Sequence, residues 1–337
     1  MTERPLHLSS VKGVAVPNGE ASRPMTWAKA HQVAHMAAAK AHHALKVDLD
    51  GVSVDVVSAL GAAGVMVIWR PMPQLFGAYI NETGSVPGVL VNYGLPRPAR
   101  RYTCAHELGH HWMRHSTTVD DGSSIDTALQ EDIDAVPAAN RRRAWPEQEK
   151  VAETFASWFL MPRRVVANAL DVLNLTKPRN AADAYALSLL LGTSYRTTVR
   201  HMPNLRLASM AQANSWSSVA PGRIKASLDK GVAAPGTRYP DIWVLDKRFS
   251  GLRLPVKASD RLVLTDASGA ASFTSTGRAP LAPLSPLGPT AGALHAGTVY
   301  EIGPGAPGDE ISLDFTGTQT ILFIHPTPAG LDPRGAA

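Results

Sequence analysis

Cysteine is almost absent from this sequence of 337 residues: Cys104 is the only one, so no internal disulfide bond can form. Structural disulfides belong to oxidising compartments, and this composition therefore favours a reducing one. Long uncharged apolar runs are also absent, and residues 1–24 contain no apolar targeting segment. We therefore expect a cytoplasmic protein with no membrane-spanning segment and no membrane partner.

The sequence also lacks a large excess of either positive or negative charge. The sequence holds 33 Lys and Arg against 28 Asp and Glu, which gives a formal net charge of +5. Its only run of three like charges is Arg141–Arg143. A solvated surface cluster explains such a run better than a nucleic-acid interface does, so we expect no nucleic-acid partner.

What the sequence does contain is an apolar fraction of 45%, enough for a sizeable core in about two domains. Helical periodicity dominates up to about residue 210, interrupted by the β-type runs VMVIW (65–69) and GVLVNYG (88–94). Further along, short β-type runs follow one another: DIWVLD, RLVLTD, ASFTST, TVYEI, ISLDF and TILFIHP. We predict an α+β protein with a flexible arm (1–24), a mostly helical domain with a small sheet (25–210) and a β-rich domain (220–330).

One predicted helix carries the pentapeptide His106-Glu107-Leu108-Gly109-His110. Residues four apart lie on the same face of a helix, so the two imidazoles can bind one tetrahedral Zn²⁺. Glu107 lies beside them and can act as the general base toward a metal-bound water, which is the mechanical meaning of HExxH. Gly109 is unfavourable in the middle of a helix and suggests close approach of a neighbouring backbone. The alternative is a surface helix that carries two histidines by chance.

A peptidase site also needs a third protein ligand and an open coordination position. The next predicted helix, EQEKVAETFASWFLM (147–161), places Glu149 and Glu153 on one face, together with two alanines that would permit close packing. Spacing alone cannot choose between these two glutamates. His115 is a weaker candidate, because five residues after His110 it is rotated well away from the metal face.

The segments TCAHELGHHWMRH and EKVAETFASWFLMP together resemble the ImmA/IrrE family of metallo-endopeptidases, over roughly residues 25–205. The resemblance implies a zincin-like fold in the helical domain, with His106, His110 and Glu149 as zinc ligands and Glu107 as the base. Glu153 stands where the family usually has Asn. A residue at this position is expected to hydrogen-bond to a ligating histidine without binding the metal itself. The family cleaves regulatory proteins, often helix-turn-helix repressors, so the resemblance implies a protein substrate of that kind.

Two other functions are compatible with the same residues. One is a regulatory binding protein that keeps the metallopeptidase fold without useful turnover. The other is a DNA-associated regulator acting through GTSYRTTVRHM (192–202) and Arg141–Arg143, although the family uses the former segment as a supporting helical hairpin.

Two further expectations concern how a substrate would be held. If GVLVNYG (88–94) is the edge of the small sheet, a peptide can add beside it as an extended strand. A donor for the developing oxyanion is also needed, and the sequence cannot rank its candidates. These candidates are Tyr93, Tyr185, Tyr195 and His201.

Overall fold

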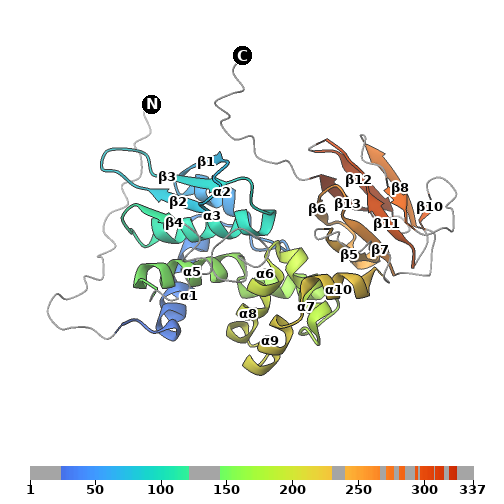
Figure 1. The fold of residues 1–337 in the computed structure, drawn as a ribbon, viewed down its shortest axis with the longest axis horizontal. Helices are drawn as coiled ribbons and strands as arrows, with labels where there is room; N and C mark the ends of the chain where they lie inside the picture. Colours follow the sequence, from blue (N-terminus) through green and yellow to red (C-terminus); the bar gives the residue numbers. More distant parts are fainter. Residues whose placement is uncertain are drawn as a thin grey trace, which may run out of the picture.

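The computed structural model describes residues 24–120, 145–229, 240–265, 271–276, 281–284, 293–294, 297–306, 308–314 and 319–324. Its elements form a helical N-terminal part with a small sheet and a β-rich C-terminal part (Figure 1), which confirms the predicted α+β class. The expected arm, apart from Pro24, and the basic run Arg141–Arg143 lie outside the described residues. No helix in the described part of the chain is both long and apolar enough to span a membrane.

The helical part holds all the helices of the described residues except for one short 3₁₀ turn among the later strands. The helices are α1 (Trp27–Ala44), α2 (Val56–Ala62), α3 (Arg97–Trp112), α5 (Glu147–Leu160), α6 (Arg163–Val172), α7 (Ala181–Leu191), α8 (Tyr195–Leu205), α9 (Met210–Ser217) and α10 (Pro221–Leu228). The side chain of Thr26 accepts a hydrogen bond from the Lys29 amide and so caps α1.

A core of three helices places the residues of HExxH. Helix α5 packs against both α1 and α3. Helix α1 presents a stripe of buried alanines to this core, and α5 contributes the fully buried Phe155 and Phe159. His42 of α1 stacks on Phe159 and contacts the Phe159 carbonyl oxygen through Nε2, at 2.9 Å. Small residues on α1 thus let a long helix lie close to the aromatic face of α5.

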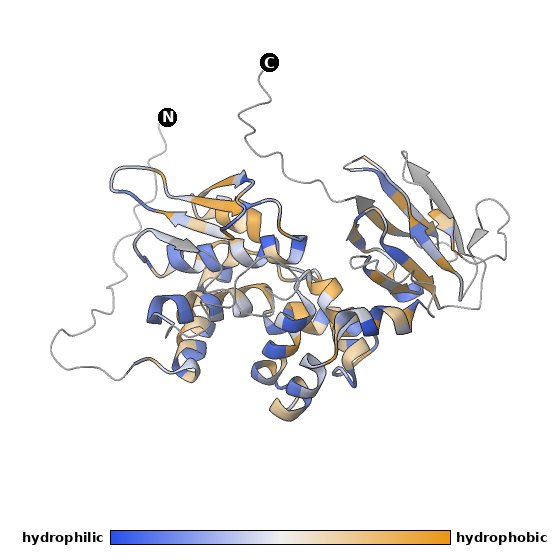
Figure 2. Cartoon of the chain, viewed as in Figure 1, coloured by the Kyte–Doolittle hydropathy of each residue, from blue (hydrophilic) through white to orange (hydrophobic). Residues whose placement is uncertain are grey.

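The small sheet lies against α3 and has the strand order β1-β3-β2-β4 (Figure 1). Its strands are β1 (Met66–Arg70), β2 (Gly77–Ile80), β3 (Gly88–Asn92) and β4 (Thr118–Asp120). Strands β1 and β3 pair in parallel and are largely apolar (Figure 2), whereas β2 runs antiparallel to both of its neighbours. The expectation that the run 88–94 forms a sheet edge is therefore wrong, because β3 is flanked on both sides.

The segment 192–202 forms a turn and a helix that are largely buried. Gly192 ends α7 in the left-handed conformation (φ 65°), and Ser194 caps α8 by accepting a hydrogen bond from the Thr197 amide. Most residues of α8 are buried, although Arg200 is exposed. A helix that reads DNA must expose its contacting face, so this burial favours the supporting hairpin.

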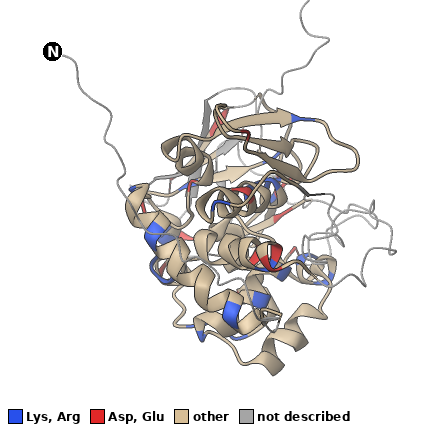
Figure 3. Ribbon diagram, turned by 90° about the vertical axis from the view of Figure 1, so that its left-hand side faces the viewer, with Lys and Arg blue, Asp and Glu red and all other residues tan. Residues whose placement is uncertain are grey.

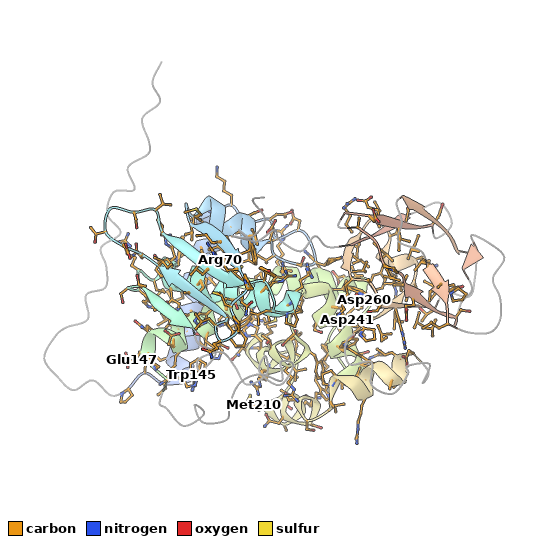
Figure 4. All side chains as sticks on the ribbon, turned by 45° about the horizontal axis from the view of Figure 1, so that its top comes forward. Arg70, Trp145, Glu147, Met210, Asp241 and Asp260 are labelled. Carbon is orange, nitrogen blue, oxygen red and sulfur yellow. The ribbon has the colours of Figure 1, made fainter. Side chains whose placement is uncertain are left out.

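The β-rich part consists of two sheets with the strand orders β10-β8-β12-β13-β6 and β5-β7-β11-β9. The strands are β5 (Ile242–Leu245), β6 (Arg253–Val256), β7 (Arg261–Leu264), β8 (Ala271–Thr276), β9 (Leu281–Pro283), β10 (Ala293–Leu294), β11 (Val299–Ile302), β12 (Glu310–Asp314) and β13 (Gln319–Ile324). All six β-type runs identified in the sequence coincide with strands. Tyr185 of α7 connects this part to the helices, because its hydroxyl donates to Asp241, close to Asp260 (Figure 4).

Candidate metal centre and active site

Helix α3 carries the first residues of the site into the interior. Pro98 lies in its first turn, where a missing N–H is tolerated, and residues 102–110 are all buried. His106 and Glu107 have no exposed surface, and His110 is only 1% exposed. Two histidines and a carboxylate buried on adjacent helical positions are costly unless they have a partner, so a surface helix with chance histidines is excluded.

The partner comes from α5. Glu149 Oε2 lies 3.2 Å from His106 Nε2 and 3.4 Å from His110 Nε2, and the two Nε2 atoms are 3.0 Å apart. Tetrahedral coordination with ligands at 2.0–2.1 Å requires ligand atoms about 3.3 Å apart. Within the described residues this is the one group of three His, Cys, Asp or Glu side chains that could hold a metal ion. The donor set and its spacing fit a divalent ion.

Glu153 lies on the other side of His106. Its Oε2 atom is 3.5 Å from His106 Nδ1, and its Oε1 atom accepts a hydrogen bond of 2.8 Å from the Tyr102 hydroxyl. The two glutamates that spacing could not separate therefore face opposite nitrogens of one imidazole. Only Glu149 is within reach of both Nε2 atoms.

Electrostatics keep the group ready for a cation. Burial alone would raise the pKa of Glu149, but its hydrogen bonds with His106 and His110 and the charges of these residues lower that pKa well below its usual range. Burial lowers the pKa of His110, which the bond to Glu149 only partly opposes. A metal binds the deprotonated carboxylate and the neutral imidazole, and these shifts favour the first at Glu149 and the second at His110.

The remaining histidines of α3 and of the loop after it face other directions. His115 Nδ1 lies 2.9 Å from His110 Nδ1, on the side of the ring opposite to Glu149, so His115 contacts His110 from behind. Burial, followed by the charge of His110, lowers the pKa of His115 to about 4. His111 contacts the Tyr79 hydroxyl of β2 at 3.0 Å, away from the group. The geometric argument against His115 as a third ligand thus agrees with its position.

The segment that carries these residues matches a known protein family. Residues 61–189, which include α3, α5 and α6, match the family model of the IrrE N-terminal-like domain, a peptidase family (M78). Over these residues the chain is similar to that family. The resemblance to the ImmA/IrrE family is confirmed over this segment, and it supports a metallopeptidase-like domain. No curated protein matches the chain.

Two glycines let the elements of the IrrE-like domain approach one another. A Cβ on Gly109 would lie 3.2 Å from the Ala152 Cα and 3.0 Å from the Phe155 Cδ1, which confirms the close approach inferred from this glycine. A Cβ on Gly77, the first residue of β2, would lie 2.4 Å from the Thr103 Cγ2 and 3.1 Å from Glu107 Oε1. Gly77 therefore brings β2 against the carboxylate of Glu107.

Sequence reasoning missed Gly77 and Tyr102. Tyr102 precedes His106 by four residues, so helical spacing alone would have placed both on one face. Gly77 offers no comparable signal, because nothing in the run FGAYI (76–80) reveals which helix packs on the strand. Its role depends on a contact between segments far apart in the sequence.

Two of the four candidate oxyanion donors use their hydroxyl groups in other hydrogen bonds. The Tyr185 hydroxyl donates to Asp241 and accepts from the Ile242 amide, and the Tyr195 hydroxyl donates to the Trp216 carbonyl. The His201 ring packs edge-on against Trp158. The fourth candidate, Tyr93, is half-buried and follows β3 directly.

Proposed function

We propose that this protein is a zinc-dependent endopeptidase. The observation that supports the proposal most directly is the triangle of His106 Nε2, His110 Nε2 and Glu149 Oε2, with sides of 3.0 to 3.4 Å. Histidine and glutamate donors in this number are the ligand set of catalytic zinc in peptidases. When bound, the ion supplies Lewis acidity that polarises a carbonyl and lowers the pKa of water.

The chain's own residues would then perform the proton transfers. Glu107 follows His106 directly, is buried and lies against β2, where Gly77 leaves room for its carboxylate. In this position Glu107 would take a proton from the attacking water and deliver it to the departing amine. Glu149, His106 and His110 would hold the ion, and the buried surroundings would strengthen each of these interactions.

The substrate would bind as an extended peptide. Strand β4 is the outer strand next to β2, and it begins three residues after His115, which contacts His110. A peptide added beside β4 would use backbone hydrogen bonds and make few demands on side-chain identity. We propose a regulatory protein as the substrate, in keeping with the family, and a helix-turn-helix repressor as the first candidate.

The DNA-associated alternative receives little support from the described residues. Helix α8 is mostly buried, and along the described helices lysine and arginine are interspersed with other residues (Figure 3). Electrostatic attachment to DNA requires a continuous basic surface. The binding-protein alternative differs from the proposal only in turnover, so one experiment separates them.

That experiment compares the wild type with Glu107→Gln in expressing cells, by quantifying new protein N-termini. The variant keeps all three candidate ligands, so its metal content should equal that of the wild type while specific cleavage products disappear. Glu82→Gln, at an exposed position outside the site, is the matched control and should cleave normally. Metal-loaded wild type that yields the same N-termini as Glu107→Gln would instead favour the binding protein.

A further inference from the structure

Behind His106 lies a chain of hydrogen-bonding groups that the proposed reaction does not use directly. The Tyr102 hydroxyl is 2.8 Å from Glu153 Oε1, 2.9 Å from the Glu153 carbonyl oxygen and 3.0 Å from Ser157 Oγ. Glu153 Oε2 in turn is 3.5 Å from His106 Nδ1. Tyr102 is 2% exposed and Glu153 is 7% exposed, so water has little access to these groups.

The direction of each hydrogen bond follows from the number of protons. A tyrosine hydroxyl has one proton, and an ionised carboxylate attracts it more strongly than a carbonyl or a serine does. Ser157 can then donate to the Tyr102 oxygen, which leaves the Tyr102 proton for Glu153. One carboxylate oxygen is thereby fixed by Tyr102, and the other is directed toward His106.

The consequence for His106 is a defined tautomer. The Glu153 carboxylate lies 3.5 Å from Nδ1, and its negative charge favours the ring proton on that nitrogen. The lone pair of Nε2 then points toward Glu149 Oε2 and His110 Nε2, where an ion would be held. Groups that orient a ligating histidine in this way commonly change metal affinity by about 10–100-fold when removed.

We propose that Tyr102 is a positioning residue for the metal centre: it holds Glu153 so that this carboxylate orients His106. The need for it comes from Glu153 itself. Glu153 is longer than the Asn typical at this position and carries a charge, so without a donor it would have more rotamers available and an uncompensated oxygen in the interior. The inference rests on metal binding at the proposed centre but does not require peptidase turnover.

The test is a double-mutant cycle on the full-length chain, with Co²⁺ and Zn²⁺ affinity measured by competition with a chelator. Tyr102→Phe removes only the hydroxyl, and Glu153→Met removes the carboxylate at similar length. We expect Tyr102→Phe to weaken metal binding about tenfold in the wild type and less than twofold when Glu153 is already Met. The absorption spectrum of bound Co²⁺ should change in the first case and not in the second.

Tyr79→Phe is the matched control. Tyr79 is also a buried tyrosine whose hydroxyl contacts a histidine of α3, but that histidine is His111 and not a candidate ligand. This variant should keep wild-type affinity. Should Glu153→Met fail to fold, Glu153→Leu replaces it, because it likewise removes both oxygens that contact Tyr102 and His106.

Equal losses from Tyr102→Phe in both backgrounds would show a general structural role and overturn the proposal, as would unchanged affinity in the wild-type background. Failure of the peptidase assignment has a different signature. In that case, the affinity cycle would behave as described while Glu107→Gln left cellular cleavage products unchanged.

Discussion

The Cα atom of Ala152 in α5 lies 3.2 Å from the point where a Cβ on Gly109 of α3 would stand. The two helices therefore meet backbone to backbone, between the turn that carries His110 and the turn that carries Glu149. Real Cβ atoms seldom tolerate so short a contact, and the Ala152 Cα belongs to the backbone, which cannot rotate away. The separation of the two helices, and with it the size of the ligand triangle, depends on the missing side chain.

Gly109→Ala should consequently weaken metal binding more than it weakens folding. Alanine is favoured over glycine in a helix by about 1 kcal/mol, which partly offsets an overpacking cost of about 1–3 kcal/mol. The residual strain pushes α5, and Glu149 with it, away from His106 and His110. We expect metal affinity to fall at least tenfold, measured by chelator competition, and the free energy of unfolding to change by less than about 2 kcal/mol, measured in urea.

Gly61→Ala provides the control for that variant. Gly61 lies within α2, and a Cβ there would have no atom within 4 Å. It should gain stability from helix propensity alone and leave metal affinity unchanged. Wild-type affinity in Gly109→Ala would mean that α5 can shift without moving Glu149.

The two glutamates of α5 should differ in their effect on metal affinity. Glu149→Gln removes the charged oxygen that faces both Nε2 atoms, whereas Glu153→Gln changes the contacts with His106 Nδ1 and the Tyr102 hydroxyl. We expect the first substitution to cost at least tenfold more affinity than the second, by the same chelator competition. Glu147→Gln, exposed in the first turn of α5 near Trp145 (Figure 4), should have no effect. The reverse order for Glu149 and Glu153 would assign the third ligand to Glu153.

Local patterns in the sequence predicted much of this centre. Helical spacing placed His106 and His110 on one face, and a glycine in mid-helix indicated the close approach of α5. Spacing could not separate Glu149 from Glu153, because residues four apart share a face and only the crossing of α3 and α5 decides which nitrogen each one meets. Pairing between distant segments was likewise invisible. Strand β1 pairs in parallel with β3, and this contact removes β3 from the sheet edge.

The thiol of Cys104 should be unreactive in the folded protein. Cys104 has no exposed surface, and burial, opposed in part by the charge of Arg101, raises the pKa of its thiol to about 12. Alkylation needs the thiolate, so at pH 8 both access and ionisation are lacking. Mass spectrometry should detect no labelling by iodoacetamide over hours in buffer and complete labelling within minutes in denaturant. Rapid labelling without denaturant would show that α3 opens locally.

The buried His201 should make the protein less stable in acid. Burial, followed by the charges of His31, Arg163 and His35, lowers the pKa of His201 to about 3, and neither ring nitrogen bonds to a described residue. The unfolded chain binds a proton near pH 6.5, whereas the folded chain does so only near pH 3. Below pH 6.5 the unfolded state therefore holds more protons, and stability falls as the pH falls. From this group alone the loss is roughly 2 kcal/mol at pH 5.

His201→Phe removes this titration and keeps an aromatic ring against Trp158. The free energy of unfolding in urea, measured at pH 7 and pH 5, should fall less for the variant than for the wild type. All other histidines are the same in both proteins, so their contribution cancels in the difference. Substitution of the exposed His43 by Gln should leave the pH dependence of the wild type intact. A His201→Phe curve parallel to the wild type between these pH values would mean that His201 gains a proton as readily in the folded chain as in the unfolded one.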